Sequence, residues 1–406
     1  MTKMPKDGLL KRMARSGGRA DRSPLGAWFW DIDWVLLILT LFLIAIGLVA
    51  VAAASPATAQ RYSDATHHMP PLYYFWRQLM WVGVSLPVLF VVSMLPADRA
   101  RRYALIGCAG FLIMLALVPI AGVSVNGARR WLGVGIVQFQ PSEFLKPCFI
   151  VAVAWILSLK NKEQGLSGGV VAMITGALTV TIAGLLMLQP DFGQTVVFCS
   201  VWLALLLIAG ISTRSLLTLG GAALGGVIAA YLFYSTARTR IDAFLFPGST
   251  DAADKFQVNA ARATLTAGGW LGTGPGGGQM KFRLPEAHTD YIFSVIGEEF
   301  GLVACCIVAA IFLAIVVRVF VKLLDEQDEF RMLAAAGLAI QFGLQALISM
   351  AVNTGLAPSK GMTMPFISYG GSSMIALSAG MGLLLAFTRR NPFVSRSPYV
   401  VKWSGE

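Results

Sequence analysis

Residues 268–301 read GGWLGTGPGGGQMKFRLPEAHTDYIFSVIGEEFG, and the apolar run that starts inside this stretch continues to residue 318. Seven glycines come first, two cations follow at Lys281 and Arg283, and an acid stands at Asp290. An apolar run of about 17–25 residues is long enough for an α-helix to cross the roughly 30 Å hydrocarbon core of a bilayer. The stretch therefore predicts a membrane helix that carries a chemically rich segment at one end.

The composition extends this prediction to the whole chain. Hydrophobic residues make up 56% of the 406 residues and charged residues only 13%, whereas soluble domains are about 45–50% apolar. These values exclude a single soluble domain and favour an all-α polytopic membrane protein. We expect ten transmembrane helices, over residues 33–54, 73–95, 103–122, 143–159, 168–188, 193–211, 215–234, 291–318, 332–353 and 370–388.

The formal charge of +11 does not indicate a nucleic-acid partner, because the basic residues lie at the ends of apolar segments and form no single stripe. With only three histidines, a histidine-rich zinc centre is not expected. The five cysteines lie within or at the start of apolar segments, without metal-binding spacing. Disulfides are therefore not expected either.

The basic residues also fix the expected orientation. With the N-terminus in the cytoplasm, the short basic loops alternate as the positive-inside rule requires. We expect a cytoplasmic basic tail over residues 1–32, a ten-helix membrane domain over 33–388, and a cytoplasmic C-terminal tail over 389–406. The segments expected on the extracytoplasmic side are then 55–72, 123–142, 189–192, 235–290 and 354–369.

The segment 235–290, between spans 7 and 8, is by far the longest of these. Loops beyond about 12–15 residues are usually functional or disordered. Its aromatic and glycine content argues against plain disorder. We expect a large extracytoplasmic loop with short helices lying at the membrane surface.

The segment 123–147 gathers charged residues before and inside a predicted helix. Arg129 and Arg130 are adjacent cations, and Pro141 can begin the helix. Glu143 and Lys146 follow, three residues apart on one helical face. Either this pair compensates its own charges and eases insertion, or the whole segment forms an anion-binding lip for a phosphate.

Two further segments interrupt apolar runs. LQPDFGQ, residues 188–194, places Asp191 and Gln194 at the outer face, where Asp191 can simply cap the next helix. NTGLAPSKGMTMPFISYGGSS, residues 353–373, contains two prolines and a single cation, Lys360. Irregular backbone at membrane depth is tolerated only when it is buried in protein or lines a wet cavity. This second segment is the better site candidate, and its alternative is an irregular loop with a solvated lysine.

The glycines and acids of the opening stretch each have two interpretations. No strand precedes the glycines, so a nucleotide-binding loop is not favoured. We expect the glycines to let the backbone approach a ligand or the bilayer surface closely. Asp290 either caps its helix or is a reactive group. Glu298 and Glu299, about 12–14 Å further along, are either buried structural groups, protonated or paired, or part of the chemistry.

Four groups of motifs, in the same order, resemble those of the SEDS family, the shape, elongation, division and sporulation membrane proteins. They are NGARRW with FQPSEFLK, LQPDFGQT, GGWLGTGPGGGQ with LPEAHTDYIFSVIGEEFGL, and PSKGMTMPFISYGGSS. The similarity runs from the first span to the last. The long basic tail, LPEAHTD, and Lys360 followed by Gly361 resemble the division branch of the family more than its elongation branch.

The resemblance implies the ten-helix SEDS fold and a glycosyltransferase that polymerises lipid II, a disaccharide-pentapeptide on undecaprenyl pyrophosphate, in septal cell-wall synthesis. It places the Asp of HTD, here Asp290, as the essential catalytic acid, which we expect to act as general base in an inverting displacement. The expected substrate-binding residues are Arg129, Arg130, Glu143, Lys146, Lys281, Arg283, His288, Lys360 and Ser372, with Asp191, Gln194, Glu298 and Glu299 in support. A divalent cation, Mg or Mn, is a further candidate without assigned ligands.

The resemblance also implies partners and a location. The implied partners are a cognate class B penicillin-binding protein (an FtsI-like transpeptidase), other divisome proteins and membrane lipid. The location would be the bacterial inner membrane at the division septum. The expected site faces outward, where nucleotide sugars are not supplied. An activated sugar at this site would therefore arrive on a lipid carrier, as the resemblance implies. The open alternatives are a lipid II flippase, an elongation polymerase, and a scaffold that only recruits a transpeptidase.

Overall fold

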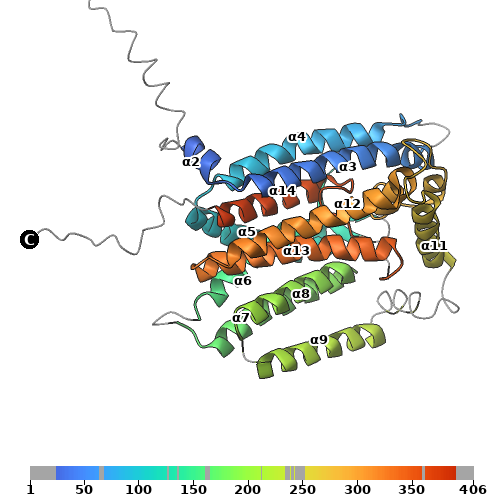
Figure 1. The fold of residues 1–406 in the computed structure, drawn as a ribbon. Coiled ribbons are helices and arrows are strands. Elements are labelled where there is room, and N and C mark those ends of the chain that lie inside the picture. The colour runs from blue at the N-terminus through green and yellow to red at the C-terminus, as the bar shows by residue number, and fades with distance from the viewer. Residues whose placement is uncertain are drawn as a thin grey trace, which may run out of the picture.

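The computed structural model of the chain consists mainly of long, roughly parallel helices (Figure 1). It describes residues 24–63, 68–125, 128–134, 137–160, 165–211, 213–233, 238, 242, 252–358 and 362–389. The described helices of 17 residues or more are α3 Trp34–Arg61, α4 Tyr73–Ser93, α5 Ala97–Ala121, α6 Pro141–Leu157, α7 Gly168–Leu188, α8 Phe192–Ile208, α9 Thr213–Phe233, α12 Ile292–Leu323, α13 Glu329–Asn353 and α14 Gly371–Thr388. These ten helices coincide in order with the ten predicted helices, and α7 has the predicted bounds.

Seven of the described helices are long and apolar enough to cross a membrane, namely α3, α4, α5, α7, α12, α13 and α14. α8 is also apolar but has only 17 residues. α12 has 32 residues, which corresponds to about 48 Å at 1.5 Å per residue. Because the hydrocarbon core is about 30 Å thick, α12 is long enough to extend beyond it.

Local capping explains where several helices begin. The Asp33 carboxylate accepts the backbone N–H groups of Val35 and Leu36 at the start of α3. Pro141 occupies the first turn of α6, as predicted. Asp191 is the N-cap of α8 and accepts the N–H of Gln194 at 3.3 Å. Each contact satisfies an N–H group that the first helical turn leaves without an intrahelical partner.

α13 and α14 lie at the centre of the bundle. In their most apolar 18-residue windows, 61% of α13 and 78% of α14 are buried, against 22% for α4 and for α5. α13 packs against α6, α8, α12 and α14, while α14 packs mainly on α4. Loops that approach either central helix therefore reach the interior of the molecule.

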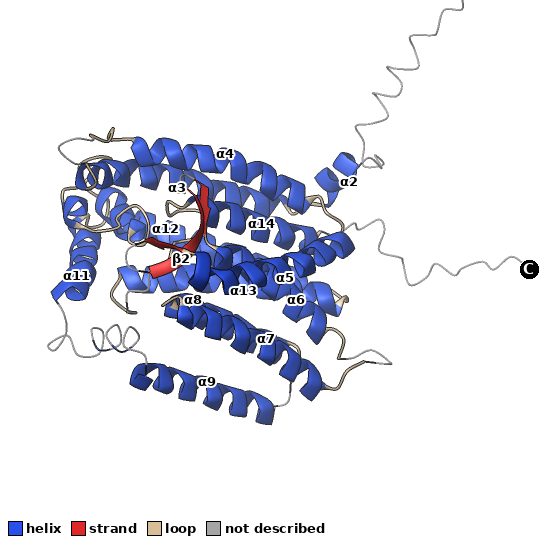
Figure 2. Cartoon of the chain, turned by 180° about the vertical axis from the view of Figure 1, so that it is seen from behind, coloured by secondary structure: helices blue, strands red, loops and turns tan. Residues whose placement is uncertain are grey.

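A small antiparallel sheet was not predicted. Its strands are β1 Val123–Val125, β2 Ala128–Val134 and β3 Val137–Phe139, in the order β1-β2-β3. The sheet packs against α5, α6 and α14 and lies across the face of the bundle seen in Figure 2. These strands lie in the segment 123–142, which the sequence indicated only as extracytoplasmic.

Three shorter elements mark the two ends of the bundle. α2, Pro24–Asp31, falls in the predicted basic tail, but Trp28 is buried there and donates to Ser93 at 2.9 Å. α2 and the end of α14 lie at one end, called here the α2 end (Figure 1). α11, Ala252–Ala267, lies across the opposite, α11 end, followed by the short helix η1, Met280–Arg283. The expected short helices of the long loop are therefore present among its described residues.

Candidate functional site

A break in α12 shapes the α11 end of the molecule. Gly301 has φ 78° and ψ 179°, which lies outside the helical region and suits glycine. The backbone groups around the break pair with the preceding glycine loop, residues 268–278. The hydrogen bonds are Thr273 N to Glu298 O (2.9 Å), Gly274 N to Glu299 O (3.0 Å), Leu302 N to Gly269 O (3.0 Å) and Val303 N to Trp270 O (3.2 Å). The loop thus replaces hydrogen bonds that an unbroken helix would make within itself.

Close packing on α12 accounts for glycine at two positions of the glycine loop. A Cβ atom on Gly272 would overlap the carbonyl group of Glu299, and one on Gly278 would overlap the carboxylate of Glu298. The prediction that the glycines approach a ligand or the bilayer is therefore wrong at these positions. The surface that they approach is α12.

Lys281 and the two glutamates of α12 form a buried ionic cluster. Lys281 Nζ pairs with Glu299 and also donates to the carbonyl of Ala53 at 2.9 Å. The Glu298 carboxylate accepts the backbone N–H groups of Met280 and Lys281, at 2.6 and 2.9 Å. Of the two interpretations of Glu298 and Glu299, the structure fits the one in which both are buried, paired structural groups. Lys281 is held inside this cluster, and its contact with substrate stays a prediction.

Asp290 lies half-buried directly before α12. The N-cap of α12 is Tyr291, so the interpretation of Asp290 as the helix cap is wrong. Three consecutive carbonyl groups hold the backbone here, and each accepts a hydrogen bond from a different donor. The bonds are Tyr369 N to His288 O (2.9 Å), Ser368 Oγ to Thr289 O (2.6 Å) and Asn353 Nδ2 to Asp290 O (2.9 Å). The segment around residue 369 and the end of α13 therefore fix the position of Asp290.

Glu286 is a second carboxylate of this turn that the sequence analysis missed. It accepts the Tyr62 hydroxyl at 2.8 Å and the Thr289 hydroxyl at 2.8 Å. Its φ of 52° lies in the left-handed region, which is uncommon for residues other than glycine. Tyr62 lies 224 residues away in the chain. In the sequence, Glu286 is marked only as an acidic residue within LPEAHTD. No feature of the sequence indicates that Tyr62 would contact it.

His288 is buried between two tyrosines. Its ring centroid lies 4.5 Å from that of Tyr74 and 5.2 Å from that of Tyr369. Its Nδ1 atom finds no hydrogen-bond partner among the described residues. Burial lowers the pKa of His288 to about 4, against a smaller opposing effect of Glu286. The imidazole is therefore neutral at physiological pH.

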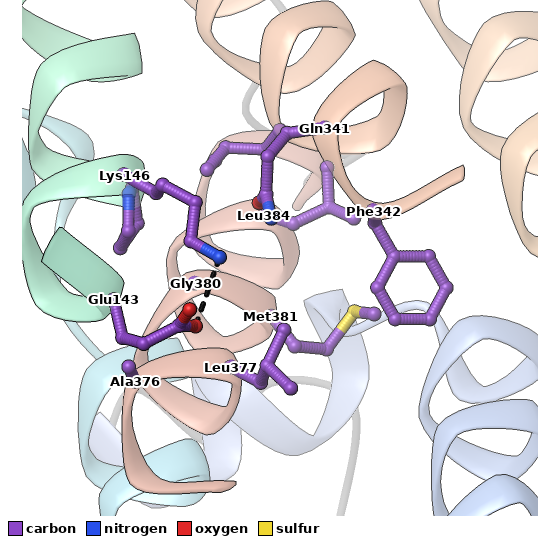
Figure 3. A pocket seen from close by; sticks show the side chains of 11 residues that line it. Glu143, Lys146, Gln341, Phe342, Ala376, Leu377, Gly380, Met381 and Leu384 are labelled. Atoms are coloured by element: carbon purple, nitrogen blue, oxygen red, sulfur yellow. Dashed lines mark ion pairs between the residues drawn. The ribbon is translucent and has the colours of Figure 1, made fainter. Parts of the chain in front are cut away.

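A second polar cluster lies in the bundle core. Lys146 pairs with Glu143 at 2.8 Å and donates to Gln345 at 3.1 Å, while Gln194 donates to Glu143 at 2.7 Å. Figure 3 shows the ion pair facing Gln341 across a small cavity. The space open to a water-sized sphere measures about 10 Å³, close to the minimum for one water molecule. The pairing predicted from the spacing of Glu143 and Lys146 is confirmed, but this cavity is too small for a sugar.

Arg130 and Asp191 connect the segments 123–142 and 189–192, both of which were predicted to be extracytoplasmic. Arg130 donates to the carbonyl groups of Gln189, at 3.1 Å, and Pro190. One of its nitrogens lies 3.9 Å from the Asp191 carboxylate. The capping interpretation of Asp191 is confirmed, and Arg130 is held by protein groups.

The remaining predicted residues are placed as follows. Arg129 and Arg283 are exposed cations, and Ser372 is buried in the first turn of α14. Lys360 lies outside the described residues. No group of three or more His, Cys, Asp or Glu side chains that could hold a metal is found in the described part of the chain. The structure thus brings His288 and Asp290 together in one turn and keeps Glu143 and Lys146 in a separate cluster.

Comparison with known proteins gives consistent matches. A family model described as cell cycle protein, FtsW/RodA/SpoVE, matches residues 33–392. A probable peptidoglycan glycosyltransferase FtsW of Caulobacter vibrioides (strain NA1000 / CB15N) is 38% identical, with 92% of this chain and 93% of that protein covered. A protein of the same name from Coxiella burnetii (strain RSA 493 / Nine Mile phase I) is 33% identical, with coverages of 89% and 98%.

Solved structures with a similar fold are also found. One, from a study of the structural coordination of polymerization and crosslinking by a peptidoglycan synthase complex, has a TM-score of 0.71 and 29% identity, covering 88% of this chain and 97% of that chain. The rod shape determining protein RodA of Thermus thermophilus has a TM-score of 0.63 and 27% identity, with coverages of 88% and 96%.

Proposed function

The chain belongs to the FtsW/RodA/SpoVE family of cell cycle proteins, and from this membership we propose that it is a peptidoglycan glycosyltransferase. Its substrate is lipid II, which it polymerises into glycan strands during septal wall synthesis. The names of the curated relatives, probable peptidoglycan glycosyltransferase FtsW, support the activity and the division branch.

One structural observation carries the assignment of the catalytic residue. Asp290 is half-buried, and hydrogen bonds from Tyr369, Ser368 and Asn353 fix the backbone from His288 to Asp290. A reactive group held in one place by surrounding structure avoids part of the entropic cost of reaching the transition state. The orientation predicted from the basic loops puts this end on the extracytoplasmic side.

In the proposed reaction, the Asp290 carboxylate accepts the proton of the acceptor N-acetylglucosamine 4-hydroxyl. The hydroxyl oxygen attacks the anomeric carbon of the donor N-acetylmuramic acid as the bond to the pyrophosphate breaks. Undecaprenyl pyrophosphate leaves with the electron pair, and the anomeric carbon is inverted. The attacking hydroxyl and the leaving pyrophosphate both belong to the substrates. The protein therefore has to align the hydroxyl with the anomeric carbon.

The leaving pyrophosphate needs positive charge. Arg129 and Arg283 are exposed and, with Lys360, are the proposed cations, whereas Lys281, Lys146 and Arg130 are held by protein partners. A divalent cation, Mg or Mn, stays a further proposal. Magnesium is commonly held by one or two carboxylates together with substrate phosphates, and Asp290 and Glu286 are the nearby carboxylates.

We further propose that the enzyme works in the bacterial inner membrane with both termini in the cytoplasm. α2 and the last described residues of α14 lie at the same end of the bundle (Figure 1), which supports placing both termini on one side of the membrane. The similar solved structure comes from a peptidoglycan synthase complex, and by analogy the proposed partner is a class B penicillin-binding transpeptidase. Other divisome proteins complete the proposed assembly.

The test is polymerisation of purified lipid II by the full chain in detergent, where transport across a bilayer has no meaning. We expect wild type to make glycan polymer and Asp290→Asn to make at least about 100-fold less, the lower range for loss of general-base catalysis. Asp98→Asn is the matched control, because the Asp98 side chain is 89% exposed at the α2 end. Normal polymer from Asp290→Asn would remove Asp290 from the mechanism. Lipid II movement in vesicles without any polymer would favour the flippase.

A further inference from the structure

Two layers of charged side chains tie α3 to α12. In the first layer, at the α2 end, Asp33 at the start of α3 pairs with Lys322 and Arg318 of α12, at 2.8 and 3.1 Å. Asp33 is buried, so this contact belongs to the packing of the two helices.

The second layer lies nearer the α11 end. Lys281 contacts the carbonyl of Ala53 in α3 and the carboxylate of Glu299 in α12. One side chain of the long loop therefore bridges the same two helices that Asp33 joins at the other end.

The two layers are one membrane thickness apart on both helices. Twenty residues separate Asp33 from Ala53, and nineteen separate Glu299 from Arg318, which gives about 30 and 29 Å at 1.5 Å per residue. Neither helix carries Asp, Glu, Lys or Arg between these positions. Since the hydrocarbon core is about 30 Å thick and excludes lone charges, the layers mark its two boundaries.

The tip of the glycine loop lies just inside the second boundary. The Trp270 carbonyl accepts a hydrogen bond from the N–H of Val303, a residue four positions past Glu299 in the direction of the membrane centre. The Trp270 and Leu271 side chains are 73% and 81% exposed. Leu302 and Val303 beside them are also exposed. A continuous apolar surface therefore faces outward at the depth of the acyl chains.

Part of the loop backbone meets the condition for such a depth. Irregular backbone can enter a bilayer only where its polar groups are paired within the protein. The carbonyls of Gly269 and Trp270 accept bonds from α12, and Gly272 N donates to Gly268 O at 2.8 Å.

We propose that Trp270 and Leu271 insert between the acyl chains of outer-leaflet phospholipids and anchor the α11 end at a fixed height. Tryptophan is enriched at the membrane interface, and leucine favours the hydrocarbon. This inference concerns the position of the chain in the bilayer, so it does not depend on the proposed reaction.

The test places a spin label at Leu271→Cys in the full chain, in nanodiscs of phosphatidylethanolamine and phosphatidylglycerol. Cys306 is exposed and is replaced by Ala in every variant. Collisions with oxygen, which concentrates in hydrocarbon, are compared with collisions with a water-soluble nickel chelate. Arg283→Cys, an exposed position of the same loop region, is the control.

We expect a several-fold higher oxygen-to-chelate collision ratio at Leu271→Cys than at Arg283→Cys. A label at Trp270→Cys should give an intermediate ratio, which provides a second probe if the first variant folds poorly. Equal ratios at Leu271→Cys and Arg283→Cys would place the tip in water and overturn the proposal. Shielding from both reagents would mean that protein covers the tip, which also overturns it.

Discussion

In the bundle core, Glu143 and Lys146 meet each other, and Gln194 and Gln345 supply further hydrogen bonds to the pair. In the turn before α12, the hydrogen bonds go instead to the backbone carbonyls of His288, Thr289 and Asp290. The first cluster uses polar side chains to compensate charge. The second holds a main-chain segment in place, through the side chains of Ser368 and Asn353 and the backbone N–H of Tyr369. We infer that substitutions should damage stability most in the first cluster, and that effects on turnover should be confined to the second.

The largest expected effect is on stability in the core. Lys146→Met leaves the buried Glu143 carboxylate without its cation, which should cost about 3–5 kcal/mol. The double variant Glu143→Gln with Lys146→Met removes both charges and should recover much of this loss. Thermal unfolding in detergent measures both. Arg283→Met, which removes an exposed cation, is the control and should change the midpoint little. A Lys146→Met protein as stable as wild type would contradict the assignment.

A pH effect should follow from His288 in the turn. Its pKa in the folded chain is about 4, below the ordinary value of about 6.5, so the unfolded chain binds the proton first. The contribution to stability is therefore complete above pH 6.5 and is lost as the pH falls toward 4. Between pH 6.5 and 5 the loss should reach about 2 kcal/mol at most. His288→Phe should flatten this part of the unfolding midpoint against pH, and an unchanged slope would exclude His288 as the cause.

A smaller effect, mainly on turnover, is expected for the tether at Thr289. Ser368→Ala removes the hydrogen bond to the Thr289 carbonyl and leaves the N–H of Met364 without its acceptor. Because small displacements of a reacting group are costly, kcat for lipid II polymerisation should fall about tenfold, with KM nearly unchanged. Ser378→Ala, at a buried serine of α14, is the matched control. Equal losses in both variants would point to general destabilisation.

The smallest effect is expected at the contact between α3 and the turn. Tyr62→Phe removes one partly exposed hydrogen bond to Glu286, which should cost about 0.5–1.5 kcal/mol. Glu286→Gly should offset part of its lost hydrogen bonds, because glycine adopts the positive φ of this position without strain. Melting midpoints of Glu286→Gly and Glu286→Ala, which both lose the hydrogen bonds, separate the effect of the backbone from that of the side chain. A larger loss in Glu286→Gly than in Glu286→Ala would contradict the role of backbone strain.

The sequence could predict the features that depend on neighbouring residues. Hydropathy and length located the ten helices, the three-residue spacing predicted the pairing of Glu143 with Lys146, and the position of Asp191 predicted a cap. Each of these follows from local periodicity or from the geometry of one helical turn.

The features that escaped prediction depend on contacts between distant segments. The Glu286 carboxylate meets Tyr62 across 224 residues, and Ser368 meets Thr289 across 79. The break at Gly301 looks like ordinary apolar helix in sequence, because its cause is a loop that lies elsewhere in the long segment. The glycines were predicted to bring the backbone close to a ligand or the bilayer. At Gly272 and Gly278 the absence of a side chain instead allows close packing against α12.

The pairing of the glycine loop with the broken part of α12 also bears on how the chain enters the membrane. A segment that leaves polar backbone groups open is costly in hydrocarbon, so α12 is a poor candidate for insertion alone. The loop precedes α12 in the chain and therefore emerges first during synthesis. Its carbonyl and N–H groups are already synthesised when Gly301 arrives, so we expect the loop and this helix to enter the membrane together. Lengthening the connection between them should accordingly delay membrane integration.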